Sequence, residues 1–324
     1  MKFEVEKGEF GKIKVVGVGG AGIKVVDEFI RKSGLTLETI AIDTSSKSLQ
    51  NTLSPLKIQV GREGESIFYQ SRDFKEEVSS YLEGSELVFI ISGMGGIAGS
   101  LLSPYVARFS KELGALTLAV AILPFSFEGK SKRQRSLESK EFLKKEASAL
   151  LIFPNDLFFR IFSSLPCGEF FKKVNSIVTE VISSLIEPLI QPSLLDFDLV
   201  TLRKVLEDAQ EVKCGWGEGE GEDRALRSVE KALSSPLWEK REERKIRKLL
   251  VSIVGGEDLS MEEISRISDY LSFRIHPEAE VTFGTVFKKD VSEVIKITLF
   301  GVTSVGEGSI YPLKSKTEPY LWEE

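Results

Sequence analysis

The chain has few of the residues that hold disulfide-stapled or metal-bound folds together. Its 324 residues include two cysteines, Cys167 and Cys214, and a single histidine. No CxxC pair occurs, so neither a disulfide framework nor a zinc site built from cysteine and histidine is expected. We therefore predict no protein-bound metal site.

Long apolar runs are also missing. No segment of about 18 apolar residues could span a bilayer, and the opening stretch MKFEVEKGEFGK has no apolar signal core. We expect a cytoplasmic protein without direct membrane insertion. The net charge of −6, with both signs mixed along the chain, argues against a nucleic-acid partner, which favours a basic face.

The first half of the chain alternates apolar runs with segments of helical spacing. The predicted strands are Ile13–Gly19, Thr39–Asp43, Glu86–Ser92, Leu116–Leu123 and Ala149–Phe153. The predicted helices between them include Tyr105–Leu113 and Lys132–Leu150. Near-continuous apolar strands that alternate with helices predict an α/β fold with a parallel sheet covered on both faces.

The second half predicts a long helix and then a smaller domain. The helix covers about Glu169–Leu189 and is expected to end at Pro188 and Pro192. Glycine-rich Gly215–Asp223 is expected to be a loop. The elements predicted after it are a helix at Arg224–Leu233, a strand at Lys248–Val254, a helix at Ser260–Phe273, and strands at Ala279–Phe287 and Val294–Val302. They predict an α+β unit with a mixed or antiparallel sheet.

A first glycine loop follows the first predicted strand. Gly17, Gly19 and Gly22 fit the pattern GxGxxG, and Asp43 ends the next strand. This is the dinucleotide fingerprint, in which the acidic residue binds a ribose hydroxyl. Glycines let backbone N–H groups approach a phosphate, and a helix N-terminus favours negative charge. The loop alone leaves three alternatives open: a dinucleotide site, a mononucleotide site and a turn without a ligand.

A second glycine loop, GMGGIAGS, follows strand Glu86–Ser92 and opens another helix. A dinucleotide fold does not require it. PFSFEG, FPND and FFKKVN occur further along the chain, the first two after strands and the last at the start of the long helix. Because the carboxyl ends of parallel strands share one edge of a sheet, these segments are expected to rim a single pocket.

As a set, the segments VGVGGAG, PFSFEGK, PND, GEDRAL and GGEDLS resemble the FtsZ/tubulin family of filament-forming GTPases, and FtsZ more than tubulin. The resemblance covers roughly Lys12 to Thr303. It implies a Rossmann-like GTP-binding domain at 1–168, a long central helix and catalytic loop at 169–210, a C-terminal α+β domain at 211–303, and a tail at 304–324. It also implies bound GTP or GDP, accompanied by Mg²⁺ or K⁺, and head-to-tail self-assembly.

The resemblance also implies a set of nucleotide-binding residues. Phe171 would stack on guanine, and the Asn175 amide can both donate to and accept from the base; the alternative for Asn175 is a polar residue on an exposed turn. Glu128 resembles a ribose-contacting glutamate, and Lys24, in place of the family's asparagine, either contacts phosphate or is solvated. The full set is Gly19, Gly20, Ala21, Gly22, Ile23, Lys24, Asp43, Gly95, Gly96, Ile97, Ala98, Gly99, Ser100, Leu101, Pro124, Glu128, Lys132, Phe171 and Asn175.

Several of these positions depart from the family pattern. Where the family has GGGTGTG, this chain has GGIAGSL. Ile97 places a branched side chain where glycine allows close approach, Ala98 lacks a hydroxyl donor that Ser100 retains, and Leu101 replaces the last glycine. Lys132 stands in place of an arginine and cannot make a forked contact with phosphate. A lost hydrogen bond to a charged group costs about 1.5–3 kcal/mol, so weakened nucleotide binding is predicted.

The catalytic loop departs as well. The family pattern NxDxxD aligns with Asp196, Asp198 and Thr201, which would act on the neighbouring subunit's nucleotide. Asp198 keeps one acidic position and Asp196 adds a charge, but Thr201 cannot act as a base near neutral pH. The alternative is that Asp198 only caps a helix beginning near Leu199. Hydrolysis is expected to be slow or absent.

Two further alternatives concern partners and function. The tail ends EPYLWEE, which is either a docking peptide for a membrane adaptor or another FtsZ-family filament, or a segment that folds back on the C-terminal domain. The rival functions are a non-hydrolysing paralogue that scaffolds other filaments and, more remotely, an NAD(P)-dependent oxidoreductase built on the first glycine loop.

Overall fold

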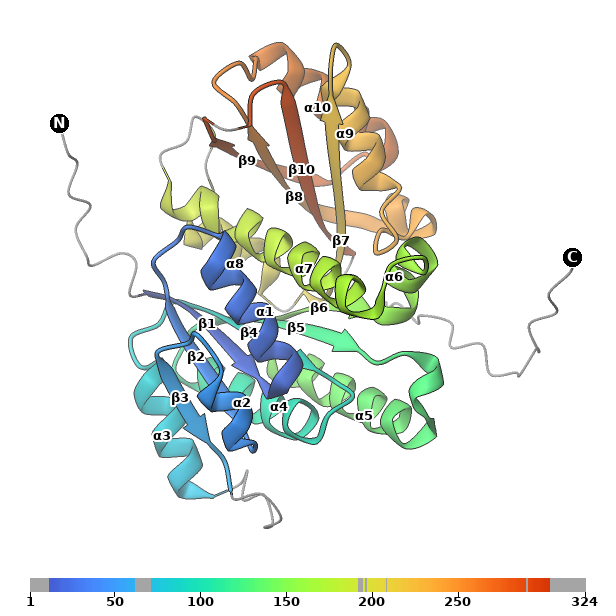
Figure 1. The fold of residues 1–324 in the computed structure, drawn as a ribbon. Coiled ribbons are helices and arrows are strands. Elements are labelled where there is room, and N and C mark those ends of the chain that lie inside the picture. The colour runs from blue at the N-terminus through green and yellow to red at the C-terminus, as the bar shows by residue number, and fades with distance from the viewer. Residues whose placement is uncertain are drawn as a thin grey trace, which may run out of the picture.

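The computed structural model describes residues 12–61, 71–191, 195, 197–207, 209–289 and 291–303. Its strands follow the order β3-β2-β1-β4-β5-β6-β7-β10-β8-β9. Figure 1 shows an N-terminal sheet and a C-terminal sheet on opposite sides of one long helix, α7. Asp196 and the tail 304–324 lie outside the described residues.

The N-terminal sheet is parallel throughout. Its strands are β1 (Ile13–Val18), β2 (Glu38–Asp43), β3 (Leu56–Gln59), β4 (Leu87–Gly93), β5 (Leu116–Leu123) and β6 (Ala149–Pro154). Nearly every residue of β1, β4 and β5 is buried, because helices cover both faces of the sheet. This confirms the prediction made from their continuous apolar runs.

Helices cover the two faces of this sheet separately. They are α1 (Gly19–Lys32), α2 (Ser46–Gln50), α3 (Arg72–Leu82), α4 (Ile97–Glu112), α5 (Lys130–Glu146) and α6 (Asn155–Phe162), with a short 3-10 turn η2 (Ser126–Glu128) before α5. One apolar cluster joins α1 and α7 to the sheet, and a second joins α3, α4 and α5 to its other face. The predicted α/β architecture is therefore confirmed.

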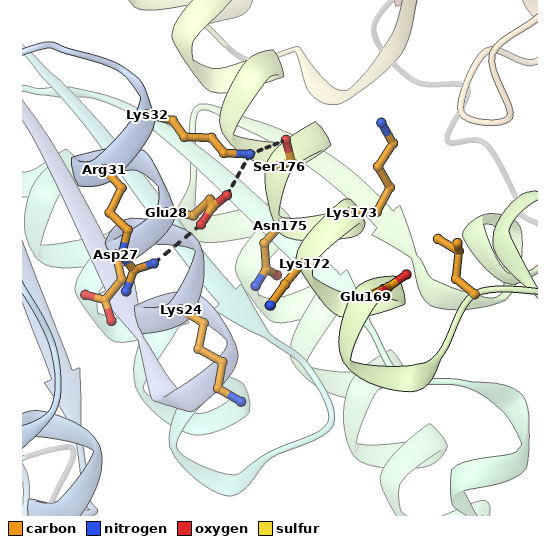
Figure 2. A pocket seen from close by; sticks show the side chains of 11 residues that line it. Lys24, Asp27, Glu28, Arg31, Lys32, Glu169, Lys172, Lys173, Asn175 and Ser176 are labelled. Atoms are coloured by element: carbon orange, nitrogen blue, oxygen red, sulfur yellow. Dashed lines mark hydrogen bonds and ion pairs between the residues drawn. The ribbon is translucent and has the colours of Figure 1, made fainter.

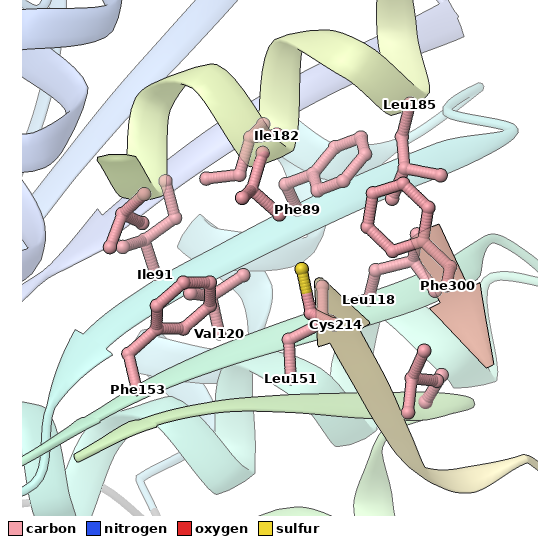
Figure 3. Close-up of a cluster of buried hydrophobic side chains, with 14 of the residues drawn as sticks. Phe89, Ile91, Leu118, Val120, Leu151, Phe153, Ile182, Leu185, Cys214 and Phe300 are labelled. Carbon is pink, nitrogen blue, oxygen red and sulfur yellow. The ribbon is translucent and has the colours of Figure 1, made fainter. Parts of the chain in front are cut away.

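Helix α7 (Cys167–Ile190) matches the long helix predicted from the sequence. Its apolar side, including Ile182 and Leu185, packs against sheet residues such as Phe89 and Leu118 (Figure 3). Pro188 was expected to help end the helix but lies inside its last turn. Among the described helices, α7 included, none has the combination of length and apolar character needed to cross a membrane.

The C-terminal sheet is mixed, as predicted. Its strands are β7 (Gln210–Glu220), β8 (Ile246–Gly255), β9 (Glu280–Phe287) and β10 (Val294–Thr303). The helices in this half of the chain are α8 (Leu199–Leu206), α9 (Arg224–Leu233) and α10 (Met261–Arg274), with a 3-10 segment η3 (Lys240–Lys245) before β8. β10 pairs antiparallel with β7 and β8, whereas β8 and β9 are parallel. The start of β7 also pairs in parallel with β6, which joins the two sheets.

The expectation of a loop at Gly215–Asp223 is wrong, because β7 extends through Glu220. Glycines alternate along this strand on the side that faces α9. A methyl group on Gly217 would lie 2.2 Å from the carbonyl oxygen of Ser228, and one on Gly219 would lie 2.0 Å from that of Arg224. The glycines therefore allow close approach of a helix to a strand rather than a turn.

Candidate nucleotide-binding site

The structure brings the predicted loops together at one edge of the N-terminal sheet. They follow β1, β4, β5 and β6, which are neighbours in that order and all parallel. The loops also contact one another. Met94 N donates to the Ile122 carbonyl at 2.9 Å, and Ser126 N donates to the Asp156 carboxylate at 3.0 Å. The edge is thus one connected surface.

The two glycine loops lie directly against each other. A methyl group on Gly19 would be 2.8 Å from the backbone nitrogen of Gly99, and one on Gly93 would be 2.6 Å from the Ala21 side chain. Gly22 is equally constrained, since its methyl group would lie 2.1 Å from the Ile91 carbonyl oxygen. These glycines allow two helix starts to converge at one point, as a phosphate cradle requires.

Helices α1 and α4 begin at this point without side-chain caps. Their N-cap residues, Val18 and Gly96, make no side-chain hydrogen bond to the first turn. Helices α5, α6, α7 and α9 also lack side-chain caps, whereas Ser71 and Ser260 cap α3 and α10. The N–H groups of an uncapped first turn need an acceptor from outside the helix, and an anion supplies one. Ile97, the first residue of α4, is 52% exposed, so much of its side chain lies outside the core.

Apart from the exposed Ile97, the side chains of the second glycine loop lie partly or fully inside the protein. Ser100 is buried and its hydroxyl donates to the Met94 carbonyl at 2.7 Å. Ala98 is buried and Leu101 is half-buried. The proton of the Ser100 hydroxyl is therefore used within the loop, so a donor from this loop to a phosphate would have to be a backbone N–H group.

Two of the predicted acidic residues organise their own loops. Glu128 accepts a hydrogen bond from Phe125 N at 2.8 Å and pairs with Lys132 Nζ at 3.0 Å. Asp43 is buried and accepts from Thr44 N at 2.7 Å. Pro124, also in the predicted set, lies against Gly95. These contacts fix the shape of the edge before any ligand binds.

A groove of about 550 Å³ lies between α1, the helix that begins at the first glycine loop, and α7 (Figure 2). Asn175 and Lys172 project from α7 toward α1 in this view. The lining residues are Lys24, Asp27, Glu28, Arg31, Lys32, Leu165, Glu169, Lys172, Lys173, Asn175 and Ser176. Phe171 stands one helical turn before Asn175 and is 42% exposed. An aromatic ring and an amide on one helix face, next to a groove, suit a flat heterocyclic base.

The charges of the groove are only partly balanced within it. Glu28 pairs with Lys32 at 2.8 Å and with Arg31 at 3.4 Å. Among the described residues, no ion pair is recorded for Lys24 or Lys172. Both side chains can therefore receive an anionic ligand.

Asn155 was missing from the predicted binding set. It begins α6 directly after β6, is buried to 7% exposure, and its side-chain oxygen has no hydrogen-bond partner among the described residues. A buried acceptor without a partner carries a free-energy penalty that a ligand donor would remove. The sequence held the signal, because the PND segment follows a predicted strand as the glycine loops do.

Two of the predicted catalytic residues, Asp198 and Thr201, lie at the other edge of the sheet from these loops. Asp198 caps α8, and its carboxylate accepts from Thr201 N at 2.7 Å, so the cap predicted for this helix is present. That backbone hydrogen bond holds the pKa of Asp198 below its usual value. Arg203 of α8 donates to the Gly114 carbonyl at 3.0 Å, just before β5. α8 thus lies at the amino edge of the sheet, opposite the carboxyl edge that carries the loops.

The fold and the site together define a class. A parallel sheet with two glycine loops and two uncapped helix starts at its carboxyl edge is the arrangement of a nucleotide-binding α/β domain. Residues 12–163 match the model of the Tubulin/FtsZ family GTPase domain, and residues 211–305 match that of the FtsZ family C-terminal domain. The chain belongs to the Tubulin/FtsZ family.

Individual relatives agree with this assignment. The chain is 32% identical to the cell division protein FtsZ of Aquifex aeolicus (strain VF5) over 302 residues, covering 89% of this chain and 82% of that one. An FtsZ dimer from M. jannaschii superposes with a TM-score of 0.83 at 29% identity, covering 90% of this chain and 88% of that one. CetZ2 from Haloferax volcanii, a GTPγS-bound protofilament, shares the fold with a TM-score of 0.72 at 19% identity, covering 91% and 94%.

Proposed function

We propose that this chain is an FtsZ-like cytoskeletal protein that binds guanine nucleotide at the carboxyl edge of its N-terminal sheet and assembles head to tail. The observation that carries the proposal is the junction of two uncapped helix starts with the groove that holds Asn175. The junction supplies N–H donors for phosphates, and the groove supplies a place for a base.

The residues present fit a guanine nucleotide. The base stacks on the exposed ring of Phe171, while the Asn175 amide and the unpartnered Asn155 oxygen face its polar edge. Among the described residues, no three His, Cys, Asp or Glu side chains gather into a cation site. An accompanying Mg²⁺ or K⁺ would be held mainly by phosphate oxygens and water.

Self-assembly follows from where the two halves of the site lie. Helix α7 has 24 residues, which at about 1.5 Å each is roughly 36 Å long. The glycine loops lie near its start and α8 follows its end (Figure 1). Asp198 and Thr201 therefore reach a nucleotide only in a second copy, and repetition of that contact builds a head-to-tail filament.

Hydrolysis in this assembly is slow or absent. Thr201 has no carboxylate, and the Asp198 carboxylate is engaged in a helix cap with a lowered pKa, which makes it a weaker base. A non-hydrolysing member that scaffolds other filaments has the same geometry. The second glycine loop and the groove beside α7 favour a mononucleotide over NAD(P).

Nucleotide selectivity tests this function. Titration with fluorescent GDP and GTP analogues is expected to give tighter binding than with the matching adenine analogues or with NAD. Asn175→Ala should weaken guanine binding about two- to tenfold, the value of one neutral hydrogen bond. Gln134→Ala, which removes an exposed amide from α5, is the matched control and should change nothing. Equal affinity for adenine and guanine would contradict the assignment.

A further inference from the structure

An exposed phenylalanine lies at the end of helix α10, beside the basic segment η3. Phe273, in the last turn of α10, is 77% exposed. The next residue, Arg274, pairs with Glu243 of η3 at 2.9 Å. Arg244 of η3 donates in turn to the Ile275 carbonyl at 3.2 Å. The end of α10 and the segment η3 therefore form one surface.

The positive charges of this surface are not balanced within it. The carboxylate of Glu242 pairs with Lys245 at 3.5 Å, and that of Glu243 is buried and used by Arg274. For three exposed cations no ion pair is recorded within the part of the chain that the structure describes, and these are Lys240, Arg241 and Arg244. The surface can therefore receive carboxylates from outside.

We call Phe273, Lys240, Arg241 and Arg244 the η3 patch. An exposed ring beside ammonium and guanidinium groups suits a segment that combines aromatic side chains with carboxylates. Two aromatic rings attract each other beyond the area that they bury, and a guanidinium also attracts the face of a tryptophan. Opposite charges around the rings orient the incoming segment.

The chain itself contains a segment of this kind. The stretch EPYLWEE, at 318–324, lies in the tail outside the described residues. It places Tyr320, Leu321 and Trp322 among glutamates, and all its charged side chains are carboxylates. Its composition therefore complements that of the η3 patch in both apolar character and charge.

The tail begins beside the η3 patch. Thr303, the last residue of β10, pairs with Ile246, which directly follows η3. The 19 residues from Ser304 to Trp322 span at most about 65 Å when fully extended, so Trp322 can reach the patch of its own molecule. A short tether gives a local concentration on the order of 1 mM, so that even a weak contact is populated.

We propose that the tail docks on the η3 patch of its own molecule, with Trp322 against Phe273 and the carboxylates of EPYLWEE facing the three cations. The docked tail covers the patch and withholds Trp322 from other proteins. This chooses between the two alternatives that the sequence left open for the tail. The inference does not depend on the proposed nucleotide-binding function.

Quenching of Trp322 fluorescence by acrylamide tests the contact in the full chain without nucleotide. The chain has three tryptophans, so a Trp322→Phe chain supplies the background that is subtracted. We expect Trp322 to be shielded in the parent. Phe273→Ala should lower the docking equilibrium constant about tenfold, as truncation of an interface anchor does. Lys240→Glu combined with Arg241→Glu should release the tail as well, and added salt should weaken docking in the parent.

Two matched controls alter the same kinds of side chain elsewhere. Met261→Ala removes a side chain that is 64% exposed at the start of α10. Lys144→Glu combined with Lys145→Glu reverses two charges near the end of α5. Both controls should leave Trp322 shielded. Melting temperatures of all the variants show that they remain folded.

Dilution separates a molecule's own tail from the tail of a second copy. Shielding by docking within one molecule does not change with protein concentration, whereas shielding that is lost on dilution shows a second copy and contradicts the proposal. Trp322 as accessible in the parent as in the free EPYLWEE peptide also contradicts it. So does equal shielding in the parent, Phe273→Ala and the charge-reversed chain. Each of these outcomes leaves the guanine-nucleotide assignment untouched, because titration tests that separately.

Discussion

Asp198 shows how a single side chain can serve both a fold and a candidate site. Its carboxylate accepts from Thr201 N and caps α8. The capping role needs a side-chain oxygen, whereas a catalytic role needs a carboxylate. Asparagine keeps the first property and lacks the second, so the two roles can be separated experimentally.

Capping predicts a specific order of stabilities. Asp198→Ala should lower the free energy of unfolding by about 1 kcal/mol, whereas Asp198→Asn should remain close to the parent. Because the folded-state pKa of Asp198 is lowered, its ionised cap contributes above the unfolded pKa, and the contribution is lost as pH falls through the folded pKa. Denaturant titrations at neutral and acidic pH measure both effects. Equal destabilisation by the two substitutions at neutral pH would contradict the capping role.

At the scale of elements, β7 and α9 pack unusually closely. Gly215, Gly217 and Gly219 face α9, and the helix backbone occupies the space that side chains would fill. This contact explains why a glycine-rich segment lies within a strand. Local glycine content predicts a turn, whereas these glycines lie in a strand because the next helix in the sequence, α9, packs directly against them.

This packing predicts a large effect from one methyl group. Gly217→Ala places that group 2.2 Å from the Ser228 carbonyl oxygen, so the strand or helix must shift, at a cost of about 1–3 kcal/mol in the free energy of unfolding. Gly168→Ala, in the first turn of α7 with open space around it, should be neutral or slightly stabilising. Equal stability of both variants in thermal and denaturant unfolding would contradict the close contact.

At the scale of the whole molecule, the features that could be predicted from the sequence are those that depend on local residue patterns. The continuous apolar runs identified five strands of the parallel sheet, and the shared edge of those strands placed four loops together. The short strand Leu56–Gln59 was missed because only Ile58 in it is fully buried, which leaves little pattern to detect. The hydrogen bonds that Ser100 and Glu128 make within their own loops were also missed, because they depend on how the loops turn in space.

The arrangement of the whole molecule also separates the proposed nucleotide site from the candidate catalytic residues. The proposed nucleotide-binding residues and the described candidate catalytic residues occupy opposite edges of one sheet, so one molecule cannot bring the two sets together. Only the arrangement of copies can bring them together. We therefore predict that guanine-nucleotide binding and assembly are coupled in this chain.

Sedimentation of the purified protein with GTP, with GDP and without nucleotide, alongside phosphate release from the same samples, tests that claim most directly. We predict nucleotide-dependent pelleting into filaments visible by electron microscopy, with phosphate release far slower than from an ordinary FtsZ assayed in parallel. Protein that stays in the supernatant under all three conditions, or that pellets equally in each, would contradict the account.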